Sequence, residues 1–448
     1  MVEMNGRLSQ AFHCMEKTVW TLCLMILGCI LHLDSGWAKS AASRNSSSDP
    51  SSRKVKSSPS TKASQHSGAP RKKKRSTKTL SQSASHPPFR VNPPRPTLPA
   101  QPVPVENGDE SESSVLRADP AFSELDLPTD NQMIFSKTNP NAFFQPTFSG
   151  RMVSGMFGCV RNPGKRGLFT RFHEGVDIRP VARDKDGEPQ DDVRAAGEGT
   201  VVYVCRQAGS SNYGKYVVIE HRLLGPPFYT LYAHMASVEE EIETGAVVKR
   251  GQKVGVLGRT SNEFDIDADH AHLHFEVNLM VNRHYLEWSR KKGDGAPRHG
   301  LYNGANLLGL DPVRFFQFLQ INSDLGVGDF VRRERVAFRV LTPLAKDFSW
   351  IEQYSFALSG PITETTRALE ISMTYYGLPV RVVPQSREEI APARWKALAN
   401  GIYPLTFADT RELTSHACCA LVISRGKYWR LGPKGYDWLR QLLFHEPD

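Results

Sequence analysis

Histidine is combined with a carboxylate in one short stretch of this 448-residue chain, His173-Glu-Gly-Val-Asp177. The glycine and valine inside it favour an extended chain over a helix, and side chains on a strand alternate between its two faces. The side chains of His173 and Asp177 would then project from the same face, with only Gly175 between them. An imidazole and a carboxylate placed in this way could bind one metal ion.

Two further stretches carry histidines in an apolar, strand-like setting. His234 ends an apolar run, and His272-Leu-His274 opens the run HFEV, so that His272 and His274 would share a strand face. Two imidazoles and one carboxylate suit Zn²⁺, and a catalytic zinc site keeps a further position for water. Because the motifs HExxH and GxSxG are absent from the sequence, His234 and His272 remain to activate that water and to hydrogen-bond a developing oxyanion.

Each of these stretches could also have a purely structural role, with no part in metal binding or catalysis. HxxxD is often a surface pair, and a histidine in a strand is usually a hydrogen-bonded structural residue, as we expect for His221 and His284; the role of His270 stays open. The occurrence of all three stretches in one β-rich segment favours the metal site.

The elements that must position these residues are predominantly strands. From about residue 150, β-branched and aromatic runs alternate with Gly, Asn and Asp turns, which predicts an antiparallel all-β unit to about residue 320. From about residue 330 the pattern changes and predicts strands at 335–342, 379–384 and 419–425 and helices at 364–376, 387–400 and 435–444. The predicted fold class is mainly β: an antiparallel β-sheet domain plus a smaller C-terminal α+β domain.

Seven stretches in 154–278 together carry a resemblance to a known family. They are SGMFG with Arg161 downstream, RFHEGVDI, AAGEGTVVYV, NYGKYVVIEH, YTLYAHM, VVKRGQKVGVLGRT and HLHFEV. The segment resembles the lysostaphin/LytM-like zinc metallopeptidases, many of which cleave peptide cross-links of bacterial cell walls. The resemblance implies a groove walled by antiparallel strands, with zinc at its floor.

The resemblance also implies roles for five residues. By motif position His173, Asp177 and His274 match the zinc ligands, and His234 and His272 match the two catalytic histidines that do not bind the metal. The expected protein is a zinc metalloendopeptidase acting on peptidoglycan peptides. The alternative is a non-catalytic LytM-type regulator or scaffold that activates other wall hydrolases; this class loses ligands, whereas all five residues are present here.

Two segments depart from the family pattern. The chain from Ser261 to Asp269 replaces a short Gly-containing loop, and 283–305 is an insertion. Both would line the groove, so the sequence leaves open which peptide bond is cut.

Positive charge is concentrated in one segment. Residues 39–105 carry 14 Lys and Arg and a single acid, Asp49, for a net charge of +13, whereas 106–448 has a net charge of −3. A nucleic-acid-binding domain would carry its own basic face, so we expect no nucleic-acid partner. Residues 39–115 are rich in Ser, Lys and Pro, which predicts a disordered linker. Its basic part, 39–105, is either a tether that contacts anionic wall polymers or a membrane surface, or a plain spacer.

The N-terminus predicts export. Thr18–Leu33 is uncharged over 16 residues, which is short for a membrane span and typical of a signal peptide; an uncleaved anchor formed by 18–33 is the alternative. We therefore expect a periplasmic or cell-envelope protein. Cysteines at 159, 205, 418 and 419 lie beyond the signal and would form a disulfide or stay as buried thiols.

The predicted organisation has five parts: 1–38 signal peptide or anchor, 39–115 linker, 116–153 extension of the peptidase domain, 154–321 LytM-like peptidase domain, and 330–448 α+β domain of unassigned role. The extension would either pack as a strand or lie over the groove as an inhibitory segment.

Overall fold

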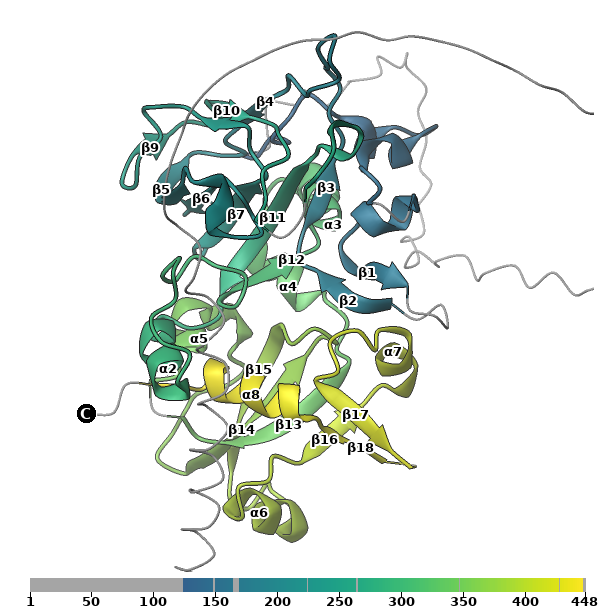
Figure 1. The fold of residues 1–448 in the computed structure, drawn as a ribbon. Coiled ribbons are helices and arrows are strands. Elements are labelled where there is room, and N and C mark those ends of the chain that lie inside the picture. The colour runs from purple at the N-terminus through teal and green to yellow at the C-terminus, as the bar shows by residue number, and fades with distance from the viewer. Residues whose placement is uncertain are drawn as a thin grey trace, which may run out of the picture. The chain divides into compact units, whose positions relative to one another are not determined.

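The computed structural model describes residues 124–147, 150–163, 169–223, 225–262, 265–345, 347–426 and 428–445 (Figure 1). The predicted signal peptide or anchor and the linker lie outside the described residues. Among the helices of the described part of the chain, none has the length and apolar composition needed to cross a bilayer.

The main sheet is antiparallel, with the strand order β12-β11-β7-β6-β5-β9, and β3 also pairs with β11. The strands are β3 (Val176–Ile178), β5 (Gly199–Cys205), β6 (Tyr216–His221), β7 (Phe228–Ala233), β9 (Val247–Val248), β11 (Leu273–Met280) and β12 (Leu307–Leu310). The β-branched and aromatic runs at 199–205, 216–221, 228–233 and 273–280 thus form the predicted strands. The fold is mainly β with antiparallel sheets, as expected.

Two smaller sheets accompany it. One has the order β4-β10-β8, formed by β4 (Asp192–Arg194), β8 (Ser237–Val238) and β10 (Lys253–Val256). The other is a hairpin of β1 (Gly158–Pro163) and β2 (Phe169–His173), whose last residue is the candidate ligand His173. β3 follows the hairpin directly and returns the chain to the main sheet.

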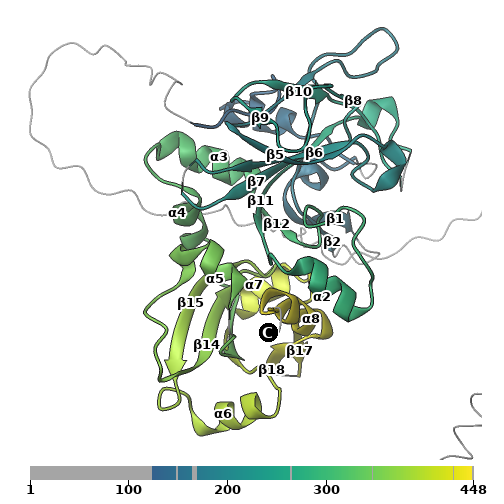
Figure 2. The same cartoon turned by 90° about the vertical axis from the view of Figure 1, so that its left-hand side faces the viewer.

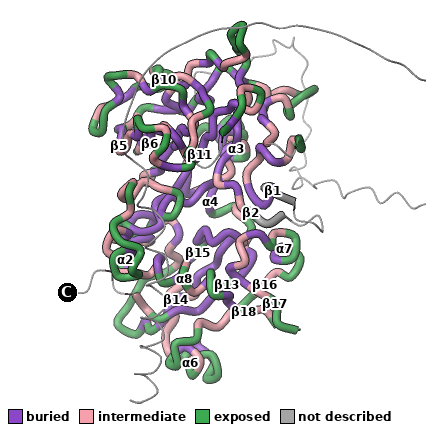
Figure 3. The backbone as a smooth tube through the Cα atoms, in the orientation of Figure 1, coloured by how far each residue is buried: buried purple, intermediate pink, exposed green. Residues whose placement is uncertain are grey.

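The two faces of β11 differ in character, although all eight of its residues are buried (Figure 3). Phe275, Val277 and Leu279 belong to the apolar core, whereas His274 and Glu276 occupy the alternate positions. Because side chains alternate along a strand, one face of β11 builds the core and the other presents polar groups.

The peptidase segment is not all-β, in contrast to the prediction. Helices α2 (Tyr285–Lys292), α3 (Pro312–Ile321) and α4 (Val327–Arg332) follow β11. The side chain of Asp311 caps α3 by accepting a hydrogen bond from the Arg314 N–H, and Pro312 occupies the first helical position. An Asp-Pro pair before an apolar run is a helix-start signal that the strand-based prediction overlooked.

The C-terminal segment combines a four-stranded antiparallel sheet with helices (Figure 2). The sheet order is β15-β14-β13-β16, and a hairpin β17-β18 lies beside it. The elements are β13 (Phe338–Pro343), α5 (Ser349–Gln353), β14 (Thr366–Met373), β15 (Pro379–Ser386), α6 (Pro392–Ala399), β16 (Leu405–Ala408), α7 (Thr410–Ser415), β17 (Val422–Arg425), β18 (Tyr428–Leu431) and α8 (Pro433–Leu442).

The helix predicted at 364–376 is wrong, because this segment forms strand β14. The buried side chains Leu369, Ile371 and Met373 alternate along β14, which pairs with β13 on one side and β15 on the other. Pairing on both edges satisfies the backbone, and this tertiary arrangement outweighs a helical spacing that is weak in so short a segment.

The chain before the hairpin packs against the sheet. After the short helix η3 (Pro140–Phe143), Phe144 forms a β-bridge with Ile178, and the Gln145 N–H donates to the carbonyl of Asp177 over 2.8 Å. Phe143 is fully buried in the core. The described part of the extension is therefore a packed edge beside β3, and only its Thr147 lines the cleft described below.

Candidate metal centre and active site

Three predicted ligands meet although they lie up to 101 residues apart in the sequence. His173 Nε2 lies 3.0 Å from His274 Nδ1, and Asp177 Oδ1 lies 3.2 Å from each of these nitrogens. Asp177 faces His274 directly across the β3–β11 ladder, whereas His173 reaches the group from the end of β2. All three side chains are buried, with Asp177 completely inaccessible.

The three ligand atoms have the spacing that a tetrahedral zinc site requires. Zinc binds imidazole nitrogen and carboxylate oxygen at about 2.0–2.2 Å, which puts neighbouring ligand atoms of a tetrahedron about 3.3 Å apart. The edges of the observed triangle, 3.0 and 3.2 Å, are close to that value. The residues therefore fit a divalent ion held by three protein ligands, with one position left for a small molecule.

Glycine between the first two ligands allows the close packing of this segment. A Cβ atom on Gly175 would lie 2.3 Å from the carbonyl oxygen of Phe275 and 2.8 Å from Cγ of Glu276. At position 175 the chain thus runs so close to β11 that no side chain larger than hydrogen fits.

Hydrogen bonds to the remaining ring nitrogens orient both ligand histidines. His173 donates from Nδ1 to the carbonyl of Met156 over 2.6 Å, and His274 donates from Nε2 to Oε1 of Glu276 over 2.8 Å. Since these nitrogens carry the protons, His173 Nε2 and His274 Nδ1 present lone pairs to the metal position. Such partners fix the tautomer and ring orientation of metal-binding histidines.

Glu276 is a functional residue that the sequence interpretation missed. Its carboxylate is fully buried and also accepts hydrogen bonds from the Tyr213 hydroxyl, over 2.8 Å, and from the Asn278 amide, over 2.7 Å. Burial alone would raise the pKa of Glu276, but the hydrogen bond from His274 holds this pKa below its usual value. The signal was present, because His274, Glu276 and Asn278 are polar at every second position of a buried strand.

The two predicted catalytic histidines lie beside the ligands. The ring centroids of His234 and His272 are 4.9 Å apart, and His272 Nε2 is 3.5 Å from Asp177 Oδ1. Each ring donates from Nδ1 to a backbone carbonyl, His234 to Thr260 over 2.8 Å and His272 to His270 over 2.7 Å. Nε2 is therefore the basic nitrogen of both rings.

His234 has a strained backbone and a depressed pKa. Its φ of 61° lies in the left-handed region, which costs a residue other than glycine about 1–3 kcal/mol and is found mainly at functional sites. The N–H of His234 donates to the carbonyl of Tyr213 over 2.9 Å and holds this conformation. Burial first, and the neighbouring His272 and His274 second, lower the pKa of His234 well below its usual value.

All four histidines and the ligand-bearing hairpin open onto one cleft of about 560 Å³. Ile266 of the segment 261–269 and the insertion residues Asn303–Ala305 form part of its wall, so both segments that depart from the family pattern reach the site. The loop Ser211–Tyr213 lines it as well. The other lining residues are Thr147, Arg171, Phe172, Glu174, His270 and His299.

The remaining histidines named in the sequence have other surroundings. His221 is buried and hydrogen-bonds the carbonyl of Glu198 and the hydroxyl of Thr230, so it is structural, as expected. His270 pairs with Asp267 over 2.6 Å at the cleft rim. His284 lies immediately before α2, where its side chain makes no capping hydrogen bond.

Residues 171–287, which contain all five predicted site residues, match the sequence profile of Peptidase family M23. This segment is a peptidase family M23 domain. Members of the family cleave peptidoglycan cross-links, and the match confirms the resemblance to LytM- and lysostaphin-like enzymes.

Solved structures similar to the M23 domain come from several bacteria. A zinc-containing peptidase from Vibrio cholerae is 27% identical over 30% of this chain and 35% of its own length, with a TM-score of 0.21. The catalytic domain of lysostaphin from Staphylococcus simulans is 20% identical over 36% of this chain and 89% of its own, with a TM-score of 0.23. The catalytic domain of the prophage-encoded M23 protein EnpA from Enterococcus faecalis is 25% identical over 30% of this chain and 86% of its own length, with a TM-score of 0.20.

This chain thus spans about a third of the length of the Vibrio cholerae peptidase. No curated protein sequence matches it.

Proposed function

We propose that this protein is an exported zinc metalloendopeptidase that hydrolyses amide bonds in the peptide cross-links of bacterial peptidoglycan. The observation that carries the proposal is the triangle of His173 Nε2, Asp177 Oδ1 and His274 Nδ1, with the basic nitrogens of two further imidazoles facing the same cleft. In this proposal His173, Asp177 and His274 hold zinc, and His234 and His272 are catalytic.

The protein residues supply proton transfer and orientation. When bound, zinc would act as a Lewis acid that lowers the pKa of water and polarises the scissile carbonyl. His272 or His234 accepts the proton of the attacking water at Nε2. The resulting imidazolium N–H then donates a hydrogen bond to the oxyanion of the tetrahedral intermediate. Burial and the neighbouring His272 and His274 lower the pKa of His234, which favours its neutral ring.

Export is supported by two independent features. The uncharged stretch Thr18–Leu33 is typical of a signal peptide or anchor. The disulfide between Cys159 and Cys418 is typical of an oxidising compartment outside the cytoplasm. We further propose that the basic residues 39–105 contact an anionic wall polymer or the membrane surface and so keep the peptidase near its substrate.

The proposal is tested on the purified full-length chain. It should carry about one zinc ion per chain and release peptide fragments from purified peptidoglycan, and a chelator should stop that release. His274→Ala should abolish both zinc binding and cleavage, whereas His284→Ala should change neither. Zinc binding and cleavage by His274→Ala at wild-type levels would contradict the ligand assignment.

The same experiment separates the enzyme from the regulator. A chain that binds zinc, releases no fragments and stimulates another wall hydrolase would replace this proposal with the regulatory one. The four histidines line one cleft and Asp177 lies buried beside them, which favours the enzyme, because a regulator has no need of two basic imidazoles beside an intact ligand set.

A further inference from the structure

We propose that the C-terminal domain, residues 330–448, is a clamp that holds the hairpin β1–β2, and through it the ligand His173, in the position that binds the metal. This assigns a role to a domain without a chemical motif of its own. It rests on the proposed function for the identity of the metal site.

The three ligands are supported in different ways. Asp177 and His274 lie opposite each other on paired strands of the main sheet. His173 ends β2, and within the described residues β1 and β2 pair only with each other. The position of His173 therefore depends on where the hairpin is held, whereas the other two ligands are fixed by the sheet itself.

The ring of His173 is also oriented from the hairpin. His173 stands opposite Gly158 in the β1–β2 register, and its Nδ1–H donates to the carbonyl of Met156 just before β1. A shift of the hairpin would move both the backbone of His173 and the acceptor that orients its imidazole.

Aromatic side chains pack the C-terminal domain against this hairpin. Tyr376, which follows β14, stacks on Phe172 with centroids 5.2 Å apart and an interplanar angle of 23°. Its ring also meets Phe157 edge-on at 5.5 Å. Phe172 directly precedes His173, so these contacts act one residue from the ligand.

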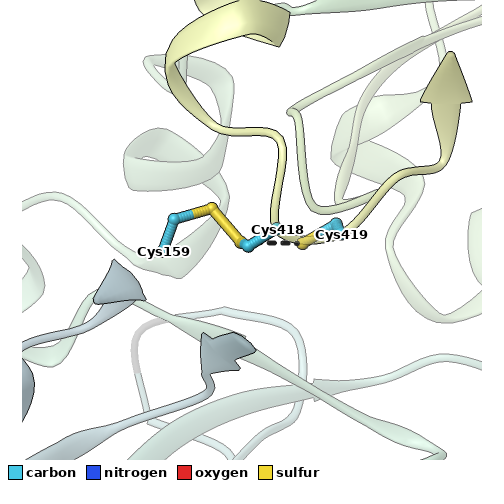
Figure 4. A group of neighbouring side chains, drawn as sticks. All are labelled: Cys159, Cys418 and Cys419. Atoms are coloured by element: carbon cyan, nitrogen blue, oxygen red, sulfur yellow. Dashed lines mark hydrogen bonds between the residues drawn. A yellow bond between two sulfur atoms is a disulfide. The ribbon is translucent and has the colours of Figure 1, made fainter. Parts of the chain in front are cut away.

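A covalent link joins the same two parts. Cys159 in β1 forms a disulfide with Cys418, which lies between α7 and β17, across 259 residues of sequence (Figure 4). Cys419 lies beside this bond with its sulfur 3.7 Å from that of Cys418, and it remains a free thiol. The bond restrains β1 next to the residue that faces His173.

Gly158 shows how closely the two parts approach. Its φ is 103°, a conformation that favours glycine, and a Cβ atom there would lie 2.8 Å from the hydroxyl oxygen of Tyr375. The residue opposite the ligand is therefore fitted against the C-terminal domain. The disulfide, the stacked aromatic rings and the close approach at Gly158 all link the C-terminal domain to the hairpin β1–β2.

The test compares variants of the full-length chain that release the clamp. Cys159→Ser with Cys418→Ser removes the disulfide, and Tyr376→Ala removes the stacked ring. Each should weaken zinc affinity, measured by competition with a chromophoric chelator, by roughly 10- to 100-fold, the range found when groups that orient metal ligands are lost. Tyr376→Phe, which keeps the ring, should retain wild-type affinity.

A second measurement does not depend on zinc. In metal-free protein, hydrogen exchange of the β1–β2 backbone amides should accelerate in the clamp variants, while exchange in β6, β7 and β11 stays at the wild-type rate. Cys419→Ser changes the same loop without touching the disulfide, and Trp395→Ala disturbs a separate cluster of the C-terminal domain. Both controls should leave the hairpin amides and zinc affinity unchanged.

The results separate the clamp from the enzyme. If hydrogen exchange of the hairpin amides is unchanged in both clamp variants, the clamp is overturned. If the wild type binds zinc and the clamp variants bind it with the same affinity, the clamp is overturned as well. A wild type that binds no zinc overturns the proposed function, and hydrogen exchange then still decides whether the hairpin is clamped. If Trp395→Ala lowered zinc affinity and accelerated hairpin exchange as much as Tyr376→Ala, the effect would be general destabilisation, and this result would also overturn the clamp.

Discussion

Each imidazole at the site has one ring nitrogen engaged by a protein acceptor. Three rings donate from Nδ1 to backbone carbonyls, and only His274 donates to a charged side chain, Glu276. Hydrogen bonds to an ionised group are stronger than those between neutral groups. Glu276 therefore raises the basicity of the nitrogen that His274 offers to the metal.

Replacing this carboxylate should weaken the metal site. Glu276→Gln keeps the size of the side chain but removes the negative charge that faces His274, and we expect zinc affinity to fall roughly 10- to 100-fold. Competition with a chelator measures the change. Glu220→Gln, on β6, is the matched control and should retain full affinity; equal affinity in both variants would exclude the role given to Glu276.

Replacement of His272 should impair proton transfer without impairing zinc binding. Its Nδ1 is held by the carbonyl of His270, and its Nε2 lies 3.5 Å from Asp177 Oδ1, outside the ligand triangle. We expect His272→Ala to keep about one zinc per chain and to lose roughly 10²–10⁴-fold in turnover, the usual contribution of a general acid–base group. Loss of zinc from this variant would make His272 a ligand instead.

At the scale of elements, the site depends on how closely the segment between β2 and β3 approaches β11. Gly175→Ala would place a methyl group 2.3 Å from the Phe275 carbonyl oxygen, which belongs to a rigid strand. We expect a loss of about 1–3 kcal/mol in the free energy of unfolding, as for other overpacked sites, together with weaker zinc binding. Denaturant unfolding and chelator competition measure these two effects.

Gly209 supplies the matched control for this substitution. A Cβ atom at Gly209 meets nothing within 4 Å, so Gly209→Ala should leave stability and zinc affinity near wild type. If both alanine variants behaved alike, the close approach at Gly175 would not constrain the site.

At the scale of the whole molecule, the M23 segment and the C-terminal segment share one apolar core. Core residues of the M23 domain and of the C-terminal sheet belong to a single buried cluster. Polar contacts cross the same boundary: the Asn282 amide donates to the carbonyl of Gln441 over 2.7 Å, and the Met280 N–H donates to the Tyr354 hydroxyl over 2.8 Å. The C-terminal segment is thus packed together with the segment that carries the site.

The stability of this structure should fall in mild acid because of His221. Burial lowers the pKa of His221 to about 4, whereas a histidine in the unfolded chain has a pKa of about 6.5. Between these values the unfolded chain binds a proton that the folded chain does not, so stability declines as the pH falls from 6.5 to 4. The expected loss from this group is about 3 kcal/mol.

His221→Gln tests this linkage because glutamine does not titrate. Denaturant unfolding of both proteins at pH 7 and pH 4.5 should show a smaller acid-induced loss in the variant than in the wild type. An identical loss in the two proteins would assign the acid sensitivity to other groups.

Much of the site could be predicted because its pattern is local. HxxxD and HxH were each expected to place two side chains on one face of a single strand, and the structure corrects this expectation. His173 ends β2 whereas Asp177 lies in β3, and His272 directly precedes β11, which begins at Leu273. The short spacing within each motif is what keeps its two side chains near the same site. The sequence accordingly indicated five side chains that the structure brings together, along with the β-rich character of their surroundings. Their roles as ligands and catalysts stay predictions.

What the sequence did not reveal depends on contacts between distant segments. Strand β14 was mistaken for a helix because its partners β13 and β15 decide its conformation. The role of Glu276 becomes visible only in the structure, where His274 and Tyr213 both donate hydrogen bonds to its carboxylate.

The amino-acid sequence by itself determined which groups are available for chemistry and which of them lie close together along the chain, since both follow from residue type and short spacing. Only the tertiary structure decided that Cys159 bonds Cys418 and that Tyr376 packs beside the first ligand. The physical reason is that long-range pairings are selected by the packing of the whole chain, which short-range pattern does not encode.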